Sequence, residues 1–290
     1  MELTEYLTDT SNKSVAKMLE SFLVTSRETL EASLVVGIVL AYLNRTNNQN
    51  YKKTVYYGIV FGILASIISA FIFTIFAGGF EGGAEEIFEG TTMLIGAFLL
   101  TTMILWMMQQ RHIAKEIEGK VEKHLMKTEP LFSHIGIFMI IFVAIIREGV
   151  ETVIFLNAIN YASGINFFGG TLGIIAAIVV GYLFFVGFKK INLKKLFNVS
   201  SILLILFAAG LVAHGIHEFE EAKIVNGIIT PLFDINHILN EKGIIGSFLK
   251  GLFGYNGNPS LLEVIAYVSY LGLIFLVYRR IESSRVKATA

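Results

Sequence analysis

The sequence contains no cysteine, which excludes disulfide bonds, thiolate metal ligands and thiol catalysis. Charge is also scarce: Asp, Glu, Lys and Arg make up 16% of the 290 residues, whereas soluble proteins average about a quarter. The formal net charge is zero and no basic stripe is present, which argues against nucleic acid as a partner. A soluble protein and a nucleic-acid-binding protein are therefore both disfavoured.

Apolar residues dominate instead, at 54% of the chain. They form runs of around twenty residues, and each run is long enough to cross a hydrocarbon core of roughly 30 Å. This pattern predicts an all-α, polytopic membrane protein embedded in the lipid bilayer. Seven transmembrane helices are expected, at about 18–43, 55–79, 88–109, 132–159, 168–188, 199–216 and 261–280.

The positions of Lys and Arg predict the orientation of these spans. Basic residues cluster in alternate connections and in the C-terminal tail, whereas the second and fourth connections have none. The clusters are Arg45, Lys52 and Lys53; Arg111, Lys115, Lys120, Lys123 and Lys127; Lys189, Lys190, Lys194 and Lys195; and Arg279, Arg280, Arg285 and Lys287. The N-terminus is therefore expected outside and the C-terminus in the cytoplasm, across the cytoplasmic (inner) membrane. Residues 1–14 lack the basic region of a cleaved signal peptide, so the first span should stay in the mature protein.

A charged motif interrupts two of the apolar spans. "SRETLEASLVVG" (26–37) aligns with "IREGVETVIFLN" (146–157), so that Arg27, Glu28 and Glu31 match Arg147, Glu148 and Glu151. In the helices that follow, Gly58, Gly62 and Ser66 match Gly169, Gly173 and Ala177. Chance similarity between apolar helices is the alternative, but two motifs recurring in the same order favour duplication.

Duplication predicts two three-helix repeats, 18–109 and 132–216, with 261–280 as an additional helix. Because each repeat has an odd number of spans, the second repeat should be inverted relative to the first. Transporters built in this way bind their substrate near the membrane midplane, between the repeats.

The six charged residues of the motifs point to a cation site. Within each motif they share one helix face, and an isolated charge at that depth costs at least about 2.5–3.5 kcal/mol. An ion-pair staple between helices is the alternative, but it accounts for only one Glu per motif. With both Arg and all four Glu ionised, a net charge of −2 remains. Up to eight carboxylate oxygens could then bind a hard cation.

Further acids and histidines are expected at the outer side. Glu89 begins the third span and Glu218 follows the sixth, and both could attract cations to an entrance, although surface acids are common there. His214 and His217 share a helix face and could bind a borderline metal, or could equally be polar interface residues. They adjoin an extracytoplasmic connection, 217–260, whose amphipathic segment "GIIGSFLKGLFGY" should lie on the membrane surface or fold back over the entrance.

The charged motifs "RETLE" and "REGVE" resemble the paired Arg-Glu-x-x-Glu motifs of the oxidase-dependent (Ftr-type) iron permeases, in which Arg-Glu-Gly-Leu-Glu is usual. The stretches 88–107 and 251–267 also resemble the bacterial branch. The resemblance implies iron permeation with Glu28, Glu31, Glu148 and Glu151 handling the metal. Bacterial members often carry a large extracytoplasmic N-terminal extension that is not seen here, so ferroxidase or iron-delivery activity is expected from a separate protein.

The expected function is therefore an iron permease, with ferric iron favoured, that carries iron into the cytoplasm and needs no cofactor. Ferrous iron or another divalent metal such as lead is the alternative cargo. A di-iron membrane enzyme ranks lower, because no Glu has a His three residues later, as such sites usually require. A structural scaffold held by ion pairs is the remaining alternative.

Overall fold

The computed structural model describes residues 2–109, 113–126, 130–186, 193–241 and 243–289, and within these ranges it contains helices and no strand. The predicted all-α class is confirmed. The helices are α1 (Glu2–Arg45), α2 (Lys52–Ala77), α3 (Gly83–Gln109), α4 (Ile113–Leu125), α5 (Pro130–Ala162), α6 (Phe167–Val186), α7 (Leu193–Glu221), α8 (Ile244–Phe253) and α9 (Leu261–Thr289), with a short 3-10 turn at Gln49–Tyr51.

Among the described residues, five helical segments are long and apolar enough to cross a membrane. They are Gln49–Ala77, Gly83–Trp106, Phe167–Phe185, Asn198–Glu221 and Leu261–Ile281. The two long helices outside this group, α1 and α5, are those that carry the charged motifs. Five of the seven predicted spans thus meet the criterion of length and hydropathy.

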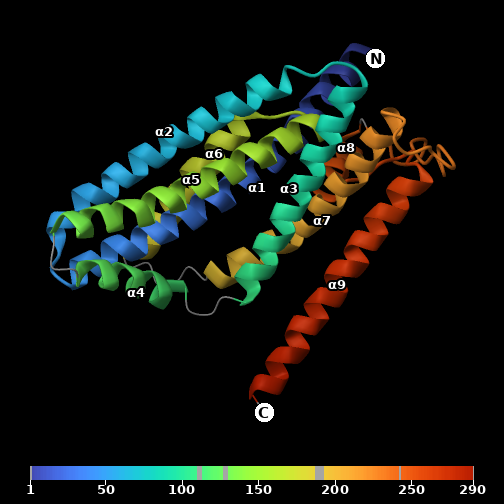
Figure 1. Cartoon of the computed structure of the whole chain (residues 1–290). Helices are drawn as coiled ribbons and strands as arrows, with labels where there is room; N and C mark the ends of the chain where they lie inside the picture. The colour runs from blue at the N-terminus through green and yellow to red at the C-terminus, as the bar shows by residue number, and fades with distance from the viewer. Residues whose placement is uncertain (1, 110–112, 127–129, 187–192, 242, 290) are drawn as a thin grey trace.

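The long helices form an elongated bundle (Figure 1). Helix α1 packs on α6, α2 on α5 and α3 on α7, while α1 and α5 also contact each other and α9 lies against α7. The start of α1, the α2–α3 turn and α8 gather at one end of the bundle, which we name the α8 end (Figure 1). Helix α4 and the C-terminus lie toward the opposite end, the α4 end.

Two apolar cores stabilise the bundle, one toward each end. The first joins α1, α3, α5 and α7 and includes Val24 and Phe155. The second joins α1, α2, α4 and α5 and includes Val39 and Ile141. Along both α1 and α5 the charged motif falls between the residues of one core and those of the other. The motifs therefore occupy a polar layer between two apolar cores.

Helix α4 was not predicted, because residues 110–131 carry many charges and have no long apolar run. Its apolar residues nevertheless share one face, and Val121 is fully buried in the second core. On its exposed side, Glu118 accepts a hydrogen bond of 2.9 Å from Arg45 at the end of α1. Of the basic residues used to predict orientation, Arg111, Lys127, Lys189 and Lys190 lie outside the described residues.

Helix α8, the amphipathic segment, folds back onto the bundle and packs against α1 and α7. Its C-terminus ends at Gly254, whose φ of 65° is a left-handed conformation that glycine adopts without strain. A Cβ atom placed on Gly210 of α7 would lie 2.5 Å from the Cα of Gly254. The backbone of α7 therefore touches the C-terminal end of α8. This contact favours the prediction that the segment folds back over the prediction that it lies on the membrane surface.

Small residues also set the spacing of the pairs α2–α5 and α6–α1. A Cβ atom on Gly62 of α2 would lie 2.7 Å from the Cβ of Ile145 and 3.4 Å from the carbonyl oxygen of Phe142 on α5. A Cβ atom on Gly173 of α6 would lie 2.6 Å from the carbonyl oxygen of Phe22 on α1. Close backbone approach of this kind is a common way to pack membrane helices.

We expect Gly173→Ala to lower the stability of the protein by about 1–3 kcal/mol, because the new methyl group meets backbone that can move only if α1 and α6 separate. Gly272→Ala in α9 is the matched control, since a Cβ atom there meets nothing within 4 Å. Thermal unfolding of both variants in detergent measures the difference. Equal melting temperatures would contradict the packing argument.

Candidate metal site

The two charged motifs meet where α1 crosses α5. One carboxylate oxygen from each of Glu28, Glu148 and Glu151 lies within 4.8 Å of the other two. Oxygens that each bind one ion at about 2.0–2.6 Å are at most about 4–5 Å apart. The three carboxylates are therefore spaced to bind a single cation, and all three come from the predicted set.

Each arginine pairs with both glutamates of its own motif. Arg27 lies 3.3 Å from an oxygen of Glu28 and 3.4 Å from one of Glu31. Arg147 lies 3.5 Å from an oxygen of Glu148 and 2.9 Å from one of Glu151. With all six groups ionised, the pairing leaves the net charge of −2 in place, because two guanidinium groups face four carboxylates.

Helix α3 packs beside the site and contacts both arginines. The Arg27 guanidinium donates a 3.0 Å hydrogen bond to the sulfur of Met103, and the Arg147 guanidinium lies 5.6 Å from the centre of the Trp106 ring. The two arginines differ in burial, because the Arg27 side chain is 1% exposed and the Arg147 side chain 45%. The site is thus closed on the Arg27 side and open on the Arg147 side.

Several carboxylate oxygens of the site have no hydrogen-bond partner. Glu28 Oε2, Glu148 Oε2 and Glu151 Oε2 are each buried and unpartnered. A buried carboxylate oxygen left without a donor is costly, and a cation would satisfy all three oxygens at once. Glu31 is outside this group of three: its own unpartnered oxygen, Oε1, is the atom that lies 3.4 Å from Arg27.

The predicted acids Glu89 and Glu218 lie away from the motifs, toward the α8 end. They come from the start of α3 and the end of α7, two helices that pack together, and their carboxylates interact electrostatically. Glu86 and Glu221 add to the same field. The structure thus brings these acids together from two helices, as a single cluster.

The two predicted histidines have different surroundings. His217 donates a 3.1 Å hydrogen bond from Nδ1 to Glu263 at the start of α9. His214 donates to the carbonyl oxygen of Gly210 and lines a small cavity together with Glu20 and Lys250. His214 is therefore not part of the group of metal-ligating atoms that contains His217.

Three acids were not predicted as site residues: Glu20 and Glu263, which are buried, and Glu220, which is half-buried with both carboxylate oxygens inaccessible. Glu263 had a local signal, since "SLLE" (260–263) is a capping box at the start of α9. Ser260 Oγ accepts from the backbone N–H of Glu263, and Glu263 Oε1 accepts from that of Ser260, both at 3.1 Å. Glu20 accepts a hydrogen bond from Ser163, which directly follows α5, and this contact depends on the fold.

Comparison with known proteins gives relatives that span nearly the whole chain. An uncharacterized protein of Archaeoglobus fulgidus is 34% identical over 278 residues, covering 91% of this chain and 97% of the relative. The "Ferrous iron permease EfeU" of Yersinia pestis is 32% identical, covering 93% and 98%. The protein of the same name from Escherichia coli O6:K15:H31 is 31% identical, covering 88% and 92%.

No solved structure matches the chain. The family model described as "Iron permease FTR1 family" matches residues 18–286, which include both charged motifs and α9. Together with the long apolar helices, this match indicates a multi-pass membrane protein that is a transporter and not an enzyme. The chain belongs to the iron permease FTR1 family.

Proposed function

We propose that this protein is an iron permease that carries iron into the cytoplasm by way of Glu28, Glu148 and Glu151. The observation that carries the proposal is the group of buried, unpartnered carboxylate oxygens that these residues contribute from two motifs. In each of these glutamates the arginine lies against Oε1 and leaves Oε2 without a partner, and a structural ion-pair staple gives no reason for three such carboxylates to converge.

The proposed architecture has seven spans, with α1 and α5 as the charged ones, arranged as two inverted repeats. When α1 is matched to α5 and α2 to α6, two close contacts become equivalent. The contact of Gly62 with the Phe142 carbonyl corresponds to the contact of Gly173 with the Phe22 carbonyl. The contact of Gly58 with Phe138 likewise corresponds to the contact of Gly169 with Met18. This equivalence of contacts supports a duplication followed by inversion.

In the proposed orientation, the α8 end faces outside and the α4 end faces the cytoplasm. The acids of α3 and α7 then lie at the outer entrance, where a field of one sign concentrates cations. A charged side chain inside a membrane normally faces a water-filled cavity, so the exposed Arg147 marks the proposed route between the site and water. Movement of one repeat against the other would expose the site to each side in turn.

Ferrous iron is the first candidate for the cargo. A net charge of −2 on the four glutamates and two arginines is balanced by a divalent ion, and the EfeU relatives are named as ferrous iron permeases. Ferric iron is the second candidate, favoured by the hardness of carboxylate oxygens. In that case a separate ferroxidase or extracytoplasmic iron-delivery protein would supply the ion.

Uptake into proteoliposomes distinguishes these candidates. We expect iron supplied anaerobically as Fe²⁺ with ascorbate to accumulate faster than the same concentration of Fe³⁺ citrate, because only the divalent ion neutralises the site. Pb²⁺ added in excess should compete with Fe²⁺ if the site selects by charge alone. Faster uptake of Fe³⁺ would establish the ferric alternative, and no uptake of either ion would contradict the permease proposal.

A further inference from the structure

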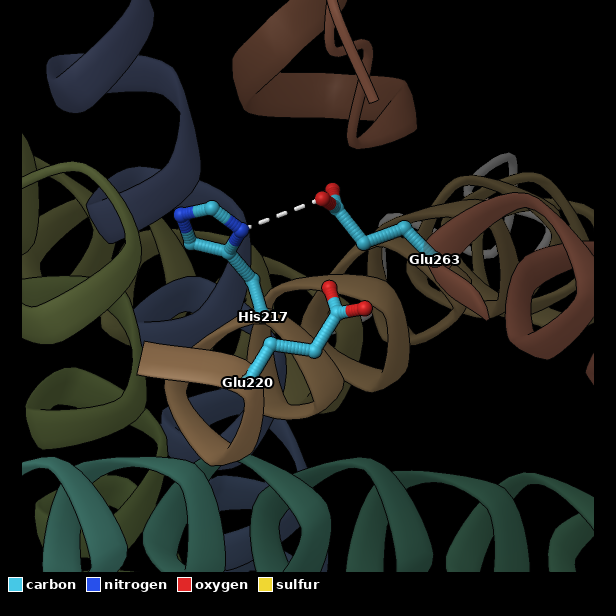
Figure 2. Close-up of side chains that lie close together, drawn as sticks. All are labelled: His217, Glu220 and Glu263. Atoms are coloured by element: carbon cyan, nitrogen blue, oxygen red, sulfur yellow. Dashed lines mark hydrogen bonds and ion pairs between the residues drawn. The ribbon is translucent and has the colours of Figure 1, made fainter. Parts of the chain in front are cut away.

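We propose a second cation site at the α8 end, formed by His217 and Glu220 of α7 and Glu263 of α9. Figure 2 shows the three side chains converging from these two helices. One ligand atom from each residue lies within 4.8 Å of the other two. The site shares no residue with the two charged motifs, so its binding of a cation is independent of them. Its role in capturing ions for transport rests on the proposed permease function.

Glu263 is held in place before any ion binds. Its side chain is 2% exposed, and its Oε1 accepts hydrogen bonds from the Ser260 backbone and from His217. Its Oε2 accepts a 2.8 Å hydrogen bond from the side-chain amide of Asn256. A ligand fixed in this way loses little conformational freedom when a cation binds.

Glu220 supplies the observation that points to a ligand. Both of its carboxylate oxygens are buried, and neither has a hydrogen-bond partner among the described residues. The carboxylate is directed toward Glu263 and His217 (Figure 2). Two carboxylates that approach each other beside one imidazole are satisfied by a divalent cation, which would replace the proton between His217 and Glu263.

The ligand set indicates which class of ion binds. One imidazole nitrogen and two carboxylates suit a first-row divalent ion such as Mn²⁺, Fe²⁺ or Zn²⁺, whereas the site on α1 and α5 offers oxygen alone. The other ring nitrogen of His217 lies 3.3 Å from Glu221 Oε1. Glu221 can therefore orient the imidazole, as carboxylates behind metal-binding histidines commonly do.

The test counts bound Mn²⁺ on the full chain in lipid nanodiscs by electron paramagnetic resonance. We expect two ions on the wild type, one on Glu220→Gln and one on the Glu28→Gln/Glu148→Gln double variant. His217→Gln should behave as Glu220→Gln does, with affinity at this site lowered by about 100-fold. Glu81→Gln, which changes an exposed acid near the same end, is the matched control and should keep both ions.

Wild-type stoichiometry and affinity in both Glu220→Gln and His217→Gln would overturn the second site. Failure of the motif site gives a different result, because the wild type and the Glu28→Gln/Glu148→Gln protein would then each bind one ion, and Glu220→Gln would bind none. The capture role is tested by Fe²⁺ uptake: Glu220→Gln should raise the KM and leave the maximal rate unchanged. An unchanged KM together with lost Mn²⁺ binding would overturn capture and retain the site.

Discussion

Iron uptake by the Glu28→Gln variant is expected to fall about 100-fold, and Glu148→Gln should have a similar effect. Loss of an outer-shell partner of a metal ligand already costs about 10–100-fold in affinity, so loss of a direct ligand should reach the upper end. Glutamine has nearly the same volume as glutamate, but removes one negative charge and one ligating oxygen. Uptake of radioactive iron into proteoliposomes measures the effect.

The matched control for this experiment is Glu118→Gln. Glu118 lies on α4, where it pairs with Arg45 far from the motifs, and the substitution makes the same chemical change. Its uptake should remain within about twofold of the wild type, because an exposed ion pair contributes at most about 1 kcal/mol. Near-normal uptake by both Glu28→Gln and Glu148→Gln, in protein that unfolds at the wild-type temperature, would show that iron does not pass this site.

The motif site could be predicted from the sequence because its signal is local. Arg27, Glu28 and Glu31 stand out against an apolar background, and helical periodicity alone places them on one face. Recurrence of the pattern at Arg147 then predicts that two such faces exist. Which oxygens approach one another depends on how α1 and α5 cross, and the local sequence pattern does not give that angle. That Glu31 falls outside the group of three carboxylates was therefore not foreseen.

Of the second site only His217 was predicted as a metal ligand, because the two glutamates are ordinary in their local context. Glu220 belongs to a run of acids at the end of α7, a pattern typical of solvated helix ends. Glu263 has a sufficient local role in capping α9. Only the packing of α9 against α7 places Glu263 beside His217. Helix α4 was missed for a related reason: its single apolar face becomes meaningful only when α1 and α5 are present to cover it.

Arg27→Gln is expected to destabilise the protein more than Arg147→Gln, with a loss of about 3–5 kcal/mol for Arg27 and a smaller loss for Arg147. The Arg27 side chain is 1% exposed and lies between two carboxylates, so its removal leaves uncompensated charge in a buried position. The Arg147 side chain is 45% exposed, so its own charge is partly solvated, whereas its partners Glu148 and Glu151 are 7% and 15% exposed. Thermal and denaturant unfolding of the two variants in one detergent gives the comparison.

The double variant Arg27→Gln/Glu31→Gln tests whether uncompensated charge causes the loss of stability in Arg27→Gln. If Arg27 neutralises Glu31 and leaves Glu28 for the ion, removing both partners should recover most of the stability lost in Arg27→Gln. Iron uptake should recover with it, because Glu28, Glu148 and Glu151 are all retained. Equal losses in Arg27→Gln and Arg147→Gln, with no recovery in the double variant, would mean that the arginines act through packing. Arg27 contacts both glutamates of the first motif, so the recovery expected here would show that Glu31 needs the arginine as its counter-charge, whereas Glu28 can bind the ion without it.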